Sequence, residues 1–128
     1  MKSLLATTAV IEATTGCALL TVPSVVARLL LGTTLEAPAA LTVARVAGAA
    51  LLALALACWL ARENGRALVV AMLIYNVGAV AILAHAGLGL ALSGIGLWPA
   101  VILHSALGGW CAACLRPSSS HNLTFSNR

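Results

Sequence analysis

The chain has 128 residues, of which 62% are hydrophobic and only 8% are charged. A soluble domain usually carries about a quarter charged residues, so this composition excludes a water-soluble globular protein. The net charge of +4 comes from basic residues scattered singly along the chain, which argues against nucleic acid as a partner. The partner that the composition predicts is the lipid bilayer.

Four apolar segments are each long enough to cross a bilayer, which requires about 20 residues per helix. The first covers residues 4–22 and ends before Pro23, where a helix breaks or kinks. A further apolar stretch around Arg28 follows. We expect it to continue the first helix or to form a short interfacial helix closed by Gly32. The other three spans are expected at residues 38–61, 67–86 and 95–115.

Polar residues and glycines separate the predicted spans. Residues 62–66 supply a charged turn, and the glycine-rich segment 87–96 suits a tight, membrane-level connection before the last span. Residues 117–128 contain too few apolar side chains to fold. The sequence therefore predicts one domain of four transmembrane helices at residues 1–116 and a disordered polar tail at residues 117–128.

Basic residues predict the orientation, because cytoplasmic loops retain more Lys and Arg than outer loops. One end of the predicted bundle carries only Arg28, whereas the other carries five basic residues: Lys2, Arg62, Arg66, Arg116 and Arg128. The predicted fold class is an all-α, integral membrane four-helix bundle with both termini in the cytoplasm. Its expected location is a bacterial inner membrane, which the chain crosses several times.

Polar residues inside the spans are the best candidates for a functional site, because a charge in hydrocarbon is costly without a partner. Glu12 lies about 12 Å from the inner end of the first span, and Arg45 about 10 Å from the outer end of the second. Asn76 and His104 occupy similar depths in the third and fourth spans. These four residues form a predicted intramembrane polar cluster with one member on each helix.

Two interpretations of this cluster are open. Either Glu12 and Arg45 form a structural ion pair that fixes the register of their helices, or Glu12 carries protons or cations. The ion pair is the simpler interpretation, since one acid beside one base requires no transported charge. It leads to a non-enzymatic membrane protein that is an accessory subunit or an oligomeric scaffold. The alternative is a small proton-coupled transporter that uses Glu12.

Small residues recur at four-residue spacing in the second span, at Ala40, Ala44 and Gly48. Such spacing lets helix backbones approach each other closely within a membrane. We therefore expect tight packing within the bundle or between subunits, as a homo-oligomer or as part of a larger membrane complex.

No enzyme, metal site or cofactor is predicted. The chain has three acids, and no nucleophile and base converge with them: Glu12, Glu36 and Glu63. A haem between His85 and His104 is disfavoured, because the two histidines differ in depth by roughly 10 Å. The CxxC spacing of Cys111 and Cys114 is expected to serve helix packing, because no second such pair exists.

Short stretches resemble two families of small membrane proteins. Residues 9–15 (AVIEATT) are similar to the first helix of small multidrug-resistance transporters, whose membrane glutamate exchanges protons for cationic drugs, although the aromatic residues of that family are missing from the first span. Residues 27–32 (ARLLLG) and 45–52 (RVAGAALL) resemble the DoxX-like group of bacterial four-helix membrane proteins. The first resemblance implies a proton-exchanging Glu12, and the second implies the fold without a defined activity.

Overall fold

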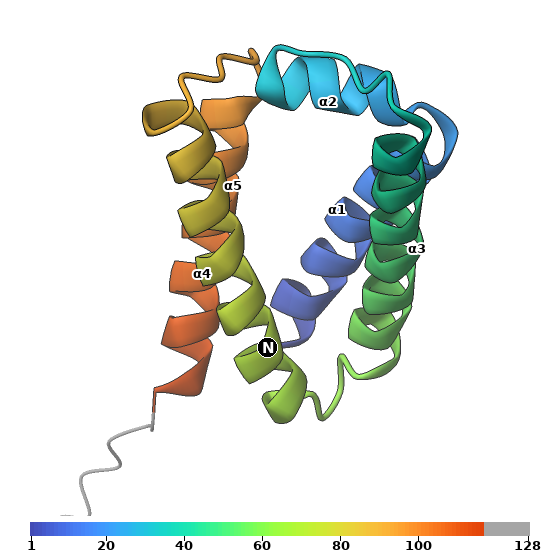
Figure 1. Ribbon diagram of the computed structural model, residues 1–128. Helices are drawn as coiled ribbons and strands as arrows, with labels where there is room; N and C mark the ends of the chain where they lie inside the picture. Colours follow the sequence, from blue (N-terminus) through green and yellow to red (C-terminus); the bar gives the residue numbers. More distant parts are fainter. Residues whose placement is uncertain (117–128) are drawn as a thin grey trace, which may run out of the picture.

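The computed structural model describes residues 1–116, which form five helices (Figure 1). They are α1 (Lys2–Thr21), α2 (Pro23–Leu31), α3 (Pro38–Leu60), α4 (Arg66–Leu88) and α5 (Leu97–Leu115). Four of them, α1, α3, α4 and α5, are long and apolar enough to cross a membrane. The four predicted spans are thus confirmed as long apolar helices. The predicted polar tail, residues 117–128, lies outside the described residues.

The four long helices are arranged as two antiparallel pairs (Figure 1). α1 packs along α3 and α4 packs along α5, whereas contacts between the pairs are fewer and run mainly from α1 to α5. α3 and α4 are consecutive in the chain but make no substantial contact, and they diverge from the turn that joins them (Figure 1). The fold is therefore two helix pairs joined at their ends rather than an evenly packed bundle.

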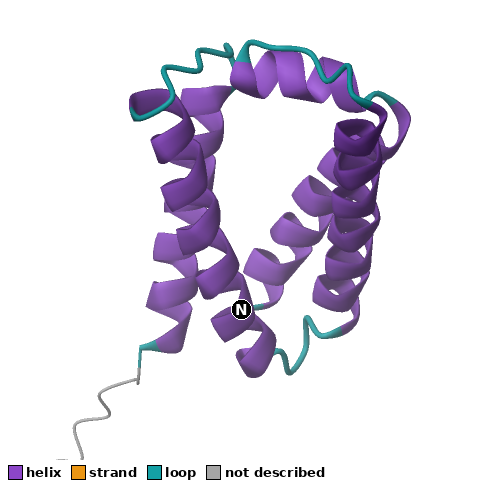
Figure 2. Cartoon of the chain, viewed as in Figure 1, coloured by secondary structure: helices purple, strands orange, loops and turns teal. Residues whose placement is uncertain are grey.

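α2 lies across one end of both pairs (Figures 1 and 2). Pro23 occupies its first turn, where the missing amide hydrogen costs nothing, and Gly32 ends it in the left-handed conformation with φ of 76°. The stretch is thus a separate helix and not a continuation of α1. Pro23 and Ala27 are buried, whereas Arg28 and Leu29 are exposed, as in a helix that lies in a membrane interface.

The glycine-rich connection between α4 and α5 is held against the end of α2. The Gly96 amide donates a hydrogen bond of 2.7 Å to the Leu29 carbonyl, one of the carbonyls that the last turn of a helix leaves unpaired. A Cβ on Gly94 would collide with the backbone of Leu30, so this close approach requires glycine. α2 and this connection therefore join the two helix pairs at one end of the molecule, the α2 end.

The contact between α1 and α3 is very close at one pair of glycines. A Cβ on Gly16 would lie 2.8 Å from the Gly48 carbonyl oxygen, and a Cβ on Gly48 would lie 2.8 Å from the Gly16 carbonyl oxygen. Gly48 is thus the member of the predicted small-residue stripe that makes a backbone contact inside the chain. This contact also places Gly16 and Gly48 at the same depth.

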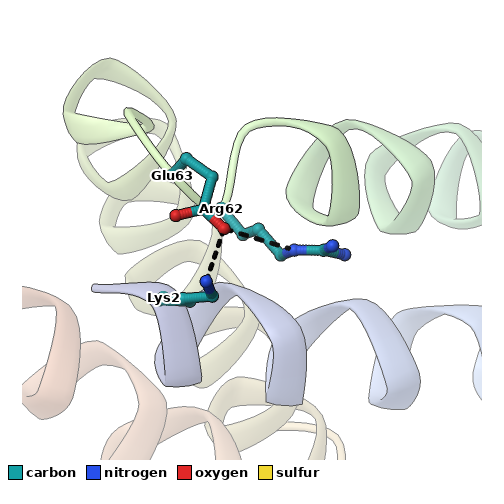
Figure 3. Close-up of polar contacts among 3 residues, drawn as sticks. All are labelled: Lys2, Arg62 and Glu63. Carbon is teal, nitrogen blue, oxygen red and sulfur yellow. Dashed lines mark ion pairs between the residues drawn. The ribbon is translucent and has the colours of Figure 1, made fainter.

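At the other end the pairs share an apolar core and several polar contacts. The core combines buried side chains from all four long helices: Leu4, Leu5, Cys58, Val69, Met72 and Cys111. Lys2 Nζ lies 2.6 Å from Glu63 Oε1 (Figure 3), and Arg66 Nη2 donates to the Leu115 carbonyl at 3.2 Å. The Lys2 hydrogen bond lowers the pKa of the Glu63 carboxyl. The N-terminus, the α3–α4 turn and the end of α5 therefore lie together.

Candidate functional site

Glu12 is buried on the face of α1 that meets α4 and α5, and only 1% of the residue is exposed. The Tyr75 hydroxyl donates a hydrogen bond of 3.3 Å to Glu12 Oε2. The other carboxyl oxygen, Oε1, is buried and has no hydrogen-bond partner among the described residues. Because burying a polar oxygen without a partner costs free energy, Glu12 is the residue most in need of explanation.

Arg45 does not pair with Glu12, so the predicted structural ion pair is wrong. Arg45 is exposed on α3, and the ion pairs of the described residues involve Lys2, Arg62 and Glu63 only. The reason is the register of α1 against α3. Glu12 lies four residues from Gly16 toward the N-terminus of α1, away from α2, and Arg45 lies three residues from Gly48 toward α2. At 1.5 Å per residue, the two charged residues are about 10 Å apart along the helix axes.

Asn76 and His104 do meet, across the contact between α4 and α5. Asn76 is fully buried; its Nδ2 donates to the Met72 carbonyl at 2.7 Å, and its Oδ1 lies 2.8 Å from His104 Nδ1. Since the amide nitrogen is occupied on its own helix, Oδ1 is the atom that accepts from the histidine, and His104 Nδ1 carries the hydrogen. In the neutral ring, Nε2 is then a hydrogen-bond acceptor.

Tyr75 connects Glu12 with His104, and the sequence analysis missed it. Its hydroxyl bonds to Glu12, and its ring meets the His104 ring edge-on, with centroids 5.6 Å apart and an interplanar angle of 78°. A usable signal was present, because Tyr75 is the only tyrosine of the chain and lies in the middle of a span. A phenol hydroxyl at that depth needs a hydrogen-bond partner.

These polar side chains line one end of a chamber between the two helix pairs. A hollow of about 130 Å³ is bordered by Glu12, Thr15, Tyr75 and His104 together with apolar residues. A second hollow of about 460 Å³ shares Thr15, Tyr75 and His104 with the first and extends toward α2. A third, of about 400 Å³, lies beneath α2 and has apolar walls that include Leu19, Val26, Leu30, Leu83 and Ala86. The chamber therefore has a polar end and an apolar end.

The chamber reaches the apolar surface of the molecule. Its wall includes Leu51 of α3 and Ile74, Gly78 and Ile82 of α4. Ile74 and Ile82 are 70% and 71% exposed, so the side of the chamber between α3 and α4 is open. The chamber therefore opens onto an apolar surface between α3 and α4.

The remaining sequence candidates lie outside this chamber. His85 is exposed on α4 and packs beside Gly89, whereas His104 is held by Asn76. Cys58 and Cys111 are packed in the apolar core at the opposite end, and all four cysteines of the chain are free. Within residues 1–116, no group of three or more His, Cys, Asp or Glu side chains is placed to hold a metal ion.

No protein-family model, curated protein sequence or solved structure matches the chain. The resemblances to small multidrug-resistance transporters and to the DoxX-like group therefore stay predictions.

Proposed function

We propose that the chain is a non-enzymatic, multi-pass membrane protein that binds an apolar cation in the chamber and exchanges it for a proton on Glu12. The observation that carries this proposal is the unpartnered Oε1 of Glu12 at the polar end of the chamber. Of the two interpretations of Glu12, the geometry favours the carrier, because Arg45 is not available to neutralise the carboxyl.

The exchange follows from the cost of burying a charge. An ionised carboxyl away from water requires a compensating positive charge, and a neutral one requires a proton. Arg and Lys side chains are absent from the residues that border the polar end. A bound proton and a bound cation therefore compete for the same carboxyl, and binding of one releases the other.

We further propose that both termini are cytoplasmic and that the membrane is a bacterial inner membrane. Lys2, Arg62, Arg66 and Arg116 lie at one end of the molecule, and Arg28 lies at the α2 end, which supports this orientation by the distribution of positive charge. In intact cells, a membrane-impermeant thiol reagent should label Thr34→Cys and spare Asn64→Cys in a chain that is otherwise free of cysteine. The reverse labelling pattern would invert the orientation.

The exchange is tested by proton release in detergent solution. Addition of dodecylammonium to weakly buffered protein at neutral pH should release protons in proportion to the protein, beyond a micelle blank. Glu12→Gln should abolish the release, and Glu36→Gln, which removes an exposed acid outside the spans, should retain it. Equal release from the Glu12→Gln protein would disprove the proposal.

A second candidate function is supported by Arg45, which is exposed about 10 Å inside α3. A lone charge on a lipid-facing helix is costly, so an acid on a second membrane protein or on another copy would stabilise it. This is the accessory subunit or oligomer expected from the sequence. Cross-linking in native membranes should give a larger species that Arg45→Leu removes and Arg28→Leu leaves in place. A monomer in every case would reject this function.

A further inference from the structure

We infer that the chamber prefers primary or secondary ammonium ions on an apolar chain over quaternary ammonium ions of the same charge and chain length. The inference rests on the proposed cation binding and specifies the chemistry of the ligand. It comes from a count of hydrogen-bond donors and acceptors at the polar end when Glu12 is ionised.

The donor hydrogens of the polar end are already used within the protein. The Tyr75 hydroxyl donates to Glu12 Oε2, and the Thr15 hydroxyl donates to the Ile11 carbonyl of its own helix at 3.0 Å. The hydrogen on His104 Nδ1 is used by Asn76 Oδ1. With Glu12 ionised, the chamber side chains of Tyr75, Thr15 and His104 therefore have no hydrogen left to donate.

Hydrogen-bond acceptors without a partner, in contrast, remain at the polar end of the chamber. Glu12 Oε1 is buried without a partner, and His104 Nε2 has no hydrogen bond within the described chain. The Tyr75 oxygen donates one hydrogen bond and keeps its lone pairs. A ligand that completes this end must therefore bring several donors, and an ammonium with two or three N–H groups does so.

A trimethylammonium head satisfies the charge but none of these acceptors. Its methyl groups would separate the positive nitrogen from Glu12 and leave Oε1 unpaired in an apolar environment, which is costly for a buried acceptor, and they would give His104 Nε2 no hydrogen bond. The rest of the ligand is less constrained. The apolar hollows of about 460 and 400 Å³ accept an alkyl chain, which can enter between α3 and α4.

The test compares dodecylammonium with dodecyltrimethylammonium by isothermal titration calorimetry, with matched micelle blanks. The primary ammonium should bind at least about tenfold more tightly, since it adds hydrogen bonds to charged and buried acceptors. His104→Phe, which keeps a ring against Tyr75, should reduce this ratio by weakening the primary ammonium alone. Glu36→Gln should leave the ratio unchanged.

The outcomes separate this inference from the proposed exchange. Equal affinity for the two cations, lost in both cases with Glu12→Gln, would overturn the inference and retain the exchange. Binding of neither cation, or binding unaffected by Glu12→Gln, would overturn both. If Glu12→Gln does not fold, the ratio in the unmodified protein still decides the inference, and Tyr75→Phe provides a second variant at the same carboxyl.

Discussion

The contact between α1 and α3 and the boundary between the two helix pairs are both built from apolar helices, yet they differ in packing. Gly16 and Gly48 bring the backbones of α1 and α3 together so closely that a methyl group does not fit between them. Between the pairs, larger side chains and the span of α2 hold the helices apart, and the chamber lies there. Small residues thus allow close backbone contact between α1 and α3, whereas the wider boundary between the two pairs leaves space for the chamber.

The largest expected effect concerns the glycine contact. Gly16→Ala places a methyl group 2.8 Å from the Gly48 carbonyl oxygen, so the two backbones must separate, and the free energy of unfolding should fall by about 2 kcal/mol. Gly109→Ala is the matched control, because nothing lies within 4 Å of its Cβ. It should be neutral or stabilising by up to about 1 kcal/mol, as expected for alanine in a helix. Thermal unfolding in detergent measures both, and equal effects would contradict the comparison.

The boundary between the two helix pairs should accept a larger side chain without loss of stability, but the added side chain should weaken binding of the cation. Gly78 lines the chamber, and nothing lies within 4 Å of a Cβ placed on it. Gly78→Leu should therefore leave the unfolding free energy within about 0.5 kcal/mol. It should weaken dodecylammonium binding about tenfold, or about 1.4 kcal/mol, by filling the chamber. Ala81→Leu adds volume at an exposed position of the same helix that does not line the chamber, and it should not change the affinity.

At the α2 end, the two helix pairs are joined by the loop between α4 and α5, which packs against the end of α2. Gly94→Ala forces the loop away from Leu30 and should break the hydrogen bond from the Gly96 amide to the Leu29 carbonyl, at a cost of about 1 kcal/mol. Hydrogen exchange of the Gly96 amide should become faster. The neighbouring exposed substitution Ser93→Ala should leave that rate unchanged, and equal rates in the two variants would show that Gly94 is not required.

The smallest expected effect concerns the exposed ion pair of Lys2 and Glu63, at the end of the molecule opposite α2. Because the Glu63 pKa is lower in the folded protein than in the unfolded chain, the pair stabilises the protein above the usual glutamate pKa of 4.5. The stabilisation is lost as the pH falls through the folded pKa. Glu63→Gln should lower the melting temperature slightly at pH 7, and the difference should shrink as the pH falls below the usual glutamate pKa of 4.5. A difference that persists at low pH, or that added salt does not reduce, would exclude this pair as its cause.

Some of the site was accessible to sequence reasoning and some was not. Glu12, Asn76 and His104 were predicted from their depth alone, and the structure brings Glu12 and His104 to one chamber while Asn76 orients His104. Arg45 was misassigned, because depth says nothing about the direction in which a helical side chain points. Tyr75 was missed, although a single mid-span tyrosine beside Asn76 was a readable signal.

The amino-acid sequence by itself determined the number and approximate bounds of the four long helices, and it left open whether the stretch around Arg28 is a separate helix. Hydropathy, span length, Pro23 and Gly32 act within one or two helical turns, so they can be read along the chain. Only the tertiary structure decided which faces meet. The Gly16–Gly48 contact sets the register that separates Glu12 from Arg45, and the contact of Gly94 with α2 joins the two pairs at the α2 end. These contacts join residues far apart in sequence, and their geometry depends on the packing of all the helices together.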